Sequence, residues 1–219
     1  MKNGENMKRT PLYSFARTFL PWFFRTLMPI RVRNAENLPR SGKAILCCNH
    51  MSMTDPLRLA YSQKRQIYFM AKEELFHNKF VSFILTALGA FPVSRGKGDK
   101  SAIATAQKIL DSGQILGIFI EGTRTKDGNF LRPKSGAVML AHNCHAPIVP
   151  CCITPKKGKM PRLFHSCYVS YGAPISEEEL GIHNGTPSEY RKASMLVMSR
   201  IAQLREEDYR QSTGETQKQ

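Results

Sequence analysis

Short apolar runs alternate with helix-forming stretches along most of this 219-residue chain. Helices are expected at Glu73–Leu88, Ser101–Leu110, Ala137–His142 and Ser188–Tyr209, with a further helix that starts at Asp55–Pro56. The runs compatible with buried strands are Ala44–Cys48, Ile67–Ala71, Phe91–Val93, Ile115–Ile120, Ile148–Ile153 and Cys167–Tyr171. This alternation predicts an α/β domain, in which a mixed, largely parallel sheet is flanked by helices.

The N-terminal residues differ from the rest in composition. Aromatic side chains between residues 12 and 30 are interrupted by prolines and by Arg17 and Arg25. A membrane-spanning helix needs about 20 predominantly apolar residues, so the arginines favour an amphipathic segment at the membrane interface. Helices docked on the domain, with their arginines in solvent, are the alternative. The predicted division is residues 1–40 as a membrane-contact segment, 41–210 as the folded domain and 211–219 as a disordered tail.

The chain is strongly basic, with 32 Lys and Arg against 17 Asp and Glu, a formal charge of +15. Such a charge favours anionic partners, whether nucleic acid, anionic lipid or phosphorylated small molecules. An RNA-recognition aromatic signature and a zinc-finger spacing are both missing from the sequence. The hypothesis of a non-catalytic basic protein that binds nucleic acid or a membrane surface is therefore supported by the charge alone. Without a recognisable secretory signal, the six cysteines are interpreted as packed thiols in a reducing cytosol.

Charged side chains follow several of the expected strands, and ligands of such sheets bind beyond the carboxyl ends of the strands. His50 and Asp55 follow the first strand. On one continuous helix they would lie about 140° apart, but they can meet if His50 is in the turn and Asp55 begins the helix. Asp55 would then hold one imidazole nitrogen and leave the other as a base. The alternative makes Asp55 a plain helix cap and His50 a loop residue.

Two arginines, Arg95 and Arg124, stand just beyond two further strands, and Glu121 and Gly122 precede the second. The planar guanidinium suits phosphate, and glycine permits a tight turn. Taken singly, each arginine could equally be a solvated surface residue. Two arginines that follow neighbouring strands on a basic chain together favour a phosphate site.

A metal site is a weaker hypothesis. His142, Cys144 and His145 lie close together in the sequence, but their spacing does not match the usual zinc sets. A metal-dependent hydrolase remains a third interpretation, which metal analysis would test. A thiol nucleophile at Cys47 or Cys48 is disfavoured, since both fall in an expected buried strand.

The segment His50–Asp55 (HMSMTD) resembles the HxxxxD motif of glycerolipid acyltransferases. Phe91–Arg95 resembles the second motif of that family, Glu121–Arg124 (EGTR) the third and Ala146–Pro150 the fourth. Their order and separations fit across about residues 25–175, and the short bacterial 1-acyl-sn-glycerol-3-phosphate acyltransferases are the most similar subgroup. Ile120 departs from the pattern, because proline is common before the glutamate.

The resemblance implies acyl transfer from acyl-CoA or acyl-carrier protein to the hydroxyl of lysophosphatidic acid, giving phosphatidic acid. It implies that the enzyme acts at an anionic membrane surface, as a peripheral or monotopic protein on the cytoplasmic side of the cell membrane. No cofactor, metal ion or nucleic acid is implied. Glycerol-3-phosphate, other lysophospholipids and ornithine lipids remain alternative acceptors.

The resemblance also assigns roles to residues. His50 would deprotonate the acceptor hydroxyl, and Asp55 would orient His50. The other implied residues are Arg95, Arg124 and Lys72, which would bind the substrate phosphate, and Glu121, Gly122 and Thr123, which would orient the substrate.

Overall fold

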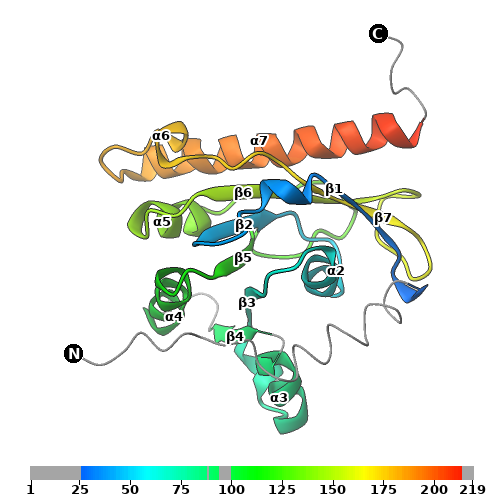
Figure 1. Ribbon diagram of the computed structural model, residues 1–219, viewed down its shortest axis with the longest axis horizontal. Helices are drawn as coiled ribbons and strands as arrows, with labels where there is room; N and C mark the ends of the chain where they lie inside the picture. Colours follow the sequence, from blue (N-terminus) through cyan, green and yellow to red (C-terminus); the bar gives the residue numbers. More distant parts are fainter. Residues whose placement is uncertain (1–25, 88, 94–99, 214–219) are drawn as a thin grey trace.

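A computed structural model describes residues 26–87, 89–93 and 100–213 (Figure 1). Its strands form one sheet in the order β1-β7-β6-β2-β5-β3-β4. Strands β6, β2, β5, β3 and β4 run parallel, β7 is antiparallel to β6, and β1 is parallel to β7. The predicted mixed, largely parallel sheet is therefore confirmed. The strands are β1 (Ile30–Arg33), β2 (Ala44–Cys48), β3 (Ile67–Lys72), β4 (Ala90–Val93), β5 (Ile115–Phe119), β6 (Ile148–Pro155) and β7 (Cys167–Tyr171).

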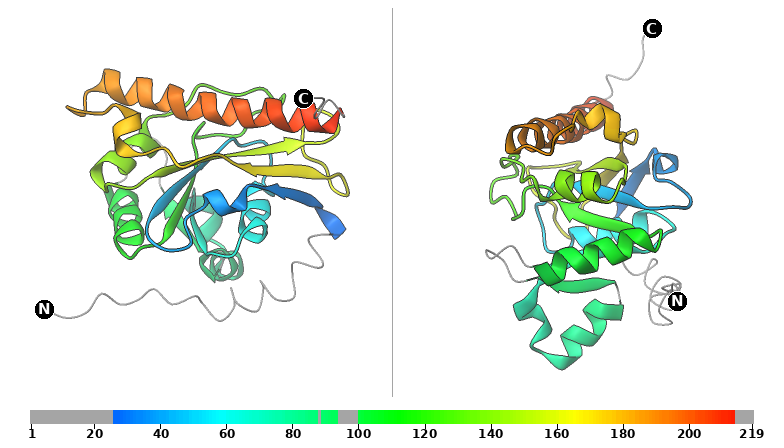
Figure 2. Two further views of the ribbon diagram at one scale, coloured as in Figure 1. Left: turned by 45° about the horizontal axis from the view of Figure 1, so that its top comes forward. Right: turned by 90° about the vertical axis from the view of Figure 1, so that its left-hand side faces the viewer.

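Helices cover both faces of the sheet (Figures 1 and 2). Strand β2 sends Ile45 and Cys47 into the core beneath α4, α5 and α7, and Leu46 and Cys48 into the core beneath α2. Burial on both faces explains why β2 is continuously apolar. The helices are α2 (Asp55–Ser62), α3 (Lys79–Ala87), α4 (Lys100–Asp111), α5 (Gly136–Asn143), α6 (Glu177–Leu180) and α7 (Pro187–Ser212), with 3-10 turns η1 (Ala35–Asn37) and η2 (Glu73–Phe76).

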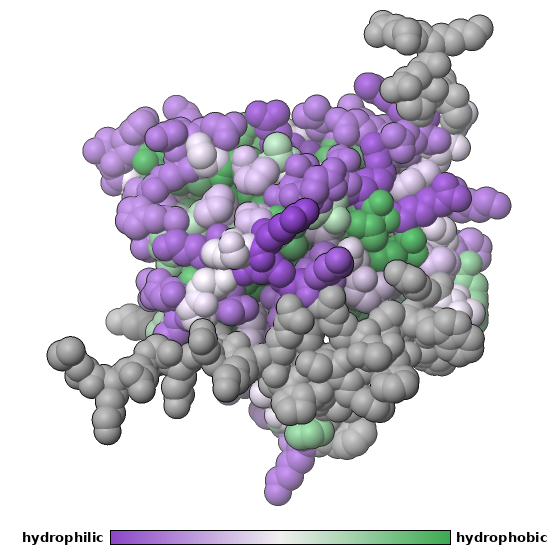
Figure 3. All heavy atoms as spheres, in the orientation of Figure 1, coloured by the Kyte–Doolittle hydropathy of each residue, from purple (hydrophilic) through white to green (hydrophobic). Residues whose placement is uncertain are grey.

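Helix α7 is the longest described element and has a well-defined start. The Thr186 hydroxyl accepts a hydrogen bond from the Glu189 backbone N–H, while the Glu189 carboxylate accepts one from the Thr186 N–H. This reciprocal cap satisfies amide groups that a helix start leaves free. Along the top of Figure 3 the side chains over α7 are mostly hydrophilic, whereas Val197, Ile201 and Leu204 are buried against the sheet.

The structure corrects the single helix predicted over Glu73–Leu88. That stretch consists of η2 (Glu73–Phe76) followed by a separate helix, α3. Asn78 separates the two, because its side-chain oxygen accepts a hydrogen bond from the Val81 N–H at 3.1 Å. Asparagine is among the preferred residues at a helix start for this reason.

Strand β1 is an element that the apolar pattern did not predict. Ile30–Arg33 pairs with β7, so the sheet includes part of the segment 1–40 that composition had set apart. Residues 1–25, which carry most of the predicted membrane-contact segment, and residues 214–219 of the tail lie outside the described residues. Among the helices that the structure describes, none combines the length and apolar character needed to cross a membrane.

Candidate active site

The side chains singled out in the sequence meet at the carboxyl edge of the parallel strands. In the register of the sheet Cys48 lies opposite Phe119, and Phe69 lies opposite Gly117. His50, Lys72 and Glu121 therefore leave β2, β3 and β5 at about the same height. The predicted convergence of strand exits follows directly from the parallel register.

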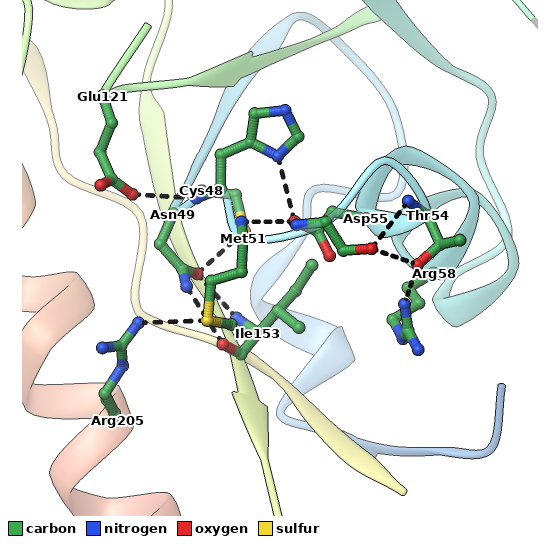
Figure 4. Close-up of polar contacts among 11 residues, drawn as sticks. Cys48, Asn49, Met51, Thr54, Asp55, Arg58, Glu121, Ile153 and Arg205 are labelled. Carbon is green, nitrogen blue, oxygen red and sulfur yellow. Dashed lines mark hydrogen bonds and ion pairs between the residues drawn. The ribbon is translucent and has the colours of Figure 1, made fainter. Parts of the chain in front are cut away.

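The His50–Asp55 pair is formed in the structure. The Asp55 side chain is fully buried, and its Oδ2 lies 3.0 Å from His50 Nδ1. The same oxygen accepts backbone N–H groups from Met51 at 2.7 Å and from Ser52 at 2.6 Å. These amides fold the segment back over the start of α2, so that residues five apart in the sequence come into contact (Figure 4).

The pair leaves one imidazole nitrogen available. A carboxylate at 3.0 Å can only accept a hydrogen bond, so Nδ1 is the donor, and in the neutral ring the lone pair is then on Nε2. No described residue hydrogen-bonds to Nε2. The ring is 13% exposed and stacks on Phe119, with centroids 3.9 Å apart and planes 15° apart. His50 is thus held on two sides, by Asp55 and by Phe119, while Nε2 is left open.

Glu121 holds the backbone on which His50 sits. Its Oε1 accepts the His50 N–H at 2.9 Å (Figure 4). Its Oε2 accepts the Leu131 N–H at 2.7 Å. Glu121 is only 2% exposed. Burial raises the pKa of its carboxyl group, although these two amides and the charge of Arg205 act in the opposite direction. Its contacts are therefore those of a positioning residue that joins the His50 turn to the loop after β5.

Two further residues support the site without having been singled out in the sequence. The Asn49 carboxamide donates to the Ile153 carbonyl at 3.1 Å and accepts the Ile153 N–H at 2.9 Å, which ties the end of β2 to β6. Arg205 of α7 lies over the Phe130 ring at 3.5 Å and donates to the Gly128 carbonyl at 2.8 Å. Asn49 adjoins the motif histidine, whereas no local pattern identifies Arg205.

The residues expected to bind phosphate are placed differently from one another. Arg124 is exposed, and the next residue, Thr125, donates its N–H to the His50 carbonyl at 3.0 Å. Lys72 is half exposed and pairs with Glu74 at 3.8 Å. Because β5 lies between β3 and β2, Lys72 lies about 10 Å to the side of the β2 exit. Arg95 lies outside the described residues.

Of the two residues expected to orient the substrate beside Glu121, Gly122 closes a tight turn that begins at Phe119. Gly122 has φ +71°, which glycine adopts without strain, and its N–H donates to the Phe119 carbonyl at 2.9 Å. A side chain there would come within 3.2 Å of Lys134. Thr123 follows this turn and is exposed.

The weaker sequence hypotheses find no support in the geometry. All six cysteines are free and buried, and burial raises the pKa of Cys47 and Cys48. His142 and His145 both pair with Glu177, at 3.3 and 2.9 Å. Across residues 26–87, 89–93 and 100–213, no three His, Cys, Asp or Glu side chains are grouped so as to hold a metal ion.

Comparison with known proteins identifies the family of this chain. A family model described as Acyltransferase matches residues 29–154, more than half of the chain. The chain belongs to this acyltransferase family, which confirms the resemblance carried by the four motifs, and it is an O-acyltransferase.

Individual relatives agree with the assignment. The chain is 34% identical over 204 residues to a 1-acyl-sn-glycerol-3-phosphate acyltransferase of Bacillus subtilis, covering 88% of this chain and 96% of that protein. It is 31% identical over 123 residues to the protein of the same name from Borreliella burgdorferi, covering 55% of this chain and 49% of the other. The crystal structure of the 1-acyl-sn-glycerophosphate acyltransferase PlsC from Thermotoga maritima has the same fold. It matches with a TM-score of 0.67 at 24% identity, over 90% of this chain and 77% of that one.

Proposed function

We propose that the enzyme transfers a fatty acyl group from acyl-CoA or acyl-carrier protein to the free hydroxyl of lysophosphatidic acid, giving phosphatidic acid. The observation that carries the proposal is the His50–Asp55 pair, whose Nδ1 is engaged and whose Nε2 is left as a base. The names of relatives that match most of the chain support the choice of acceptor.

The reaction needs no covalent intermediate on the protein. Nε2 of His50 takes the proton from the acceptor hydroxyl, and the oxygen attacks the thioester carbonyl. The C–O bond forms, the C–S bond breaks, and the proton on His50 passes to the departing thiolate. Asp55 stabilises the transient imidazolium, because its carboxylate is buried 3.0 Å from Nδ1. A positioned base contributes about 10²–10⁴-fold, so substrate positioning supplies much of the remaining acceleration.

The phosphate of the acceptor would bind the cations around the carboxyl edge. Arg124 and Lys72 are exposed there, and Arg95 is the third cation proposed. Arginine offers a bidentate fork to phosphate, whereas lysine contributes a point charge. Gly122 and Thr123 stand beside Arg124, where they would help to orient the acceptor. We place the enzyme at the cytoplasmic face of the cell membrane, since its acceptor is a membrane lipid and its charge is +15.

The proposal is tested by thiol release from palmitoyl-CoA, with and without lysophosphatidic acid, in mixed detergent–lipid micelles. Wild type is compared with His50→Ala and with the control His183→Ala, which removes an exposed histidine from a loop before α7. Release should require the acceptor, should fall at least about 10²-fold in His50→Ala, and should be unchanged in the control.

The other outcomes are informative. Acceptor-independent release would indicate a thioesterase. Full activity of purified His50→Ala would overturn the role of His50. Product formed only with glycerol-3-phosphate or another lysolipid would keep the base and change the acceptor. Parallel assays with acyl-carrier protein identify the donor.

A further inference from the structure

The turn between β6 and β7 has an unusual surface composition. Residues 156–166 include Lys156, Lys157, Lys159 and Arg162 but no acidic residue. None of these cations forms an ion pair with a residue that the structure describes. Toward its β7 end, Leu163 is 50% exposed and Phe164 is 67% exposed, and we call these two residues the apolar tip. Two adjacent apolar side chains therefore project from a purely cationic turn, which we name the basic hairpin.

The backbone holds this tip in a defined conformation. Phe164 adopts φ +60°, a left-handed conformation that costs a bulky residue on the order of 1 kcal/mol. Its N–H donates to the Leu27 carbonyl at 2.8 Å, and the Cys167 N–H donates to the Pro29 carbonyl at 3.0 Å. The tip is thus fastened to the chain just before β1, close to residue 26, where the described chain begins.

The basic hairpin lies on the same side of the molecule as His50. Cys48, the last residue of β2, lies opposite Cys151, and β6 continues for four more residues to Pro155. At about 3.3 Å a residue, the hairpin starts about 13 Å beyond the end of β2. Figure 2 shows the β6–β7 turn reaching past the sheet beside the start of β1.

The hairpin also packs against the loop that carries the site. A Cβ atom at Gly128 would lie 2.3 Å from the Lys159 carbonyl oxygen, so the two backbones are in close contact there. Gly128 in turn accepts the hydrogen bond from Arg205. Whatever binds the basic hairpin is therefore held next to the loop that joins Glu121 to Leu131.

We propose that the basic hairpin is a membrane-contact surface, whose Leu163 and Phe164 insert among the headgroups of an anionic bilayer. Cations around a small apolar tip match a surface that is anionic outside and apolar within. An acidic protein would complement the cations but leave the apolar tip unexplained. The inference rests on the proposed function in one respect, namely that a membrane lipid is the acceptor. Docking here would present the His50 edge of the sheet to that lipid.

Insertion can be measured directly, because the six native thiols are buried. Leu163→Cys is labelled with a polarity-sensitive fluorophore and mixed with vesicles of phosphatidylcholine, with or without phosphatidylglycerol. The control is Met195→Cys, at a 56% exposed position on α7. We expect a blue shift at position 163 with anionic vesicles and none at position 195. Co-sedimentation of the labelled protein without a shift at 163 would overturn the proposal.

Affinity provides a second readout that does not depend on labelling. Each cation near an anionic surface raises the binding affinity about fivefold. The double variant Lys157→Gln, Lys159→Gln should therefore bind vesicles about 30-fold more weakly. Arg191→Gln with Lys192→Gln, two exposed cations on α7, should leave it unchanged. Equal losses of vesicle affinity in the two double variants would show that only the net charge matters, and this would overturn the proposal.

Turnover separates this inference from the proposed function. The hairpin variants should raise KM for lysophosphatidic acid presented in vesicles, with unchanged kcat on a short-chain, monomeric acceptor. Variants that bind vesicles normally but respond less to acyl-carrier protein would assign the surface to the donor and overturn the membrane proposal. An inactive wild type would contradict the proposed function and leave the fluorescence and vesicle-binding tests intact.

Discussion

Glu121→Gln tests whether the motif glutamate positions His50 or contacts the substrate. The carboxylate accepts backbone N–H groups from His50 at 2.9 Å and Leu131 at 2.7 Å. The glutamine amide has the same shape but only one accepting oxygen, so its NH₂ group must face one of these two N–H donors. The substitution therefore removes one hydrogen bond and leaves a buried donor without a partner.

The expected cost follows from these contacts. A hydrogen bond to a charged group contributes about 1.5–3 kcal/mol, and an unsatisfied buried donor costs about 1–3 kcal/mol. Glutamine also avoids burying a charge, a cost that the raised pKa of Glu121 reveals. We expect a net loss of about 2 kcal/mol, and a fall in Tm of about 4–8 °C for a domain of this size. The His50 backbone should shift, and a misplacement of about 1 Å costs on the order of 10²-fold in kcat.

Thermal unfolding and steady-state kinetics measure both effects. The control is Glu178→Gln, an exposed glutamate on α6, which should behave as wild type. A positioning role predicts a lower Tm and a lower kcat, with little change in KM for the acceptor. An unchanged Tm and kcat with a raised KM would refute this reasoning and restore the direct substrate contact implied by the motif.

Three further predictions concern pH, α7 and the thiols. The folded state binds the Glu121 proton more tightly than the unfolded state, because burial raises the pKa of that group. The free energy of unfolding should therefore fall as pH rises from the ordinary carboxyl pKa through the raised one. The fall should be steeper in wild type than in Glu121→Gln, by at most about 1.4 kcal/mol per pH unit. Urea titrations that show the opposite difference would contradict this. Arg205→Lys removes the planar guanidinium over Phe130 and weakens the hydrogen bond to the Gly128 carbonyl. Chemical denaturation should show a loss of about 1–2 kcal/mol in the free energy of unfolding, and kinetics should show a lower kcat. Wild-type values for both would show that α7 does not hold this loop. Burial raises the pKa of Cys152 to about 12, and all six thiols are buried, so iodoacetamide at neutral pH should label them only after unfolding; rapid labelling of the native protein would contradict the buried arrangement.

The strand exits were predictable because the relevant signals are local. The continuous apolar run of β2 indicates a strand buried on both faces, and His50 follows it directly. Pro56 at the start of α2 places Asp55 at a helix N-terminus, where its side chain can turn back toward the loop. Parallel strands with helical crossovers then bring the exits to one edge, whatever the details of packing.

The contacts that complete the site are not local, and only the tertiary structure decided them. Glu121 meets His50 from 71 residues away, and Phe119 stacks on the imidazole because β5 happens to neighbour β2. Arg205 reaches the loop at Gly128 from a helix whose sequence shows only amphipathic periodicity. Strand β1 was hidden for the same reason, since four residues of alternating character become a strand only when β7 supplies their partners. Periodicity in the sequence records which side chains are buried, whereas the choice of partner depends on how strands and helices pack across long loops.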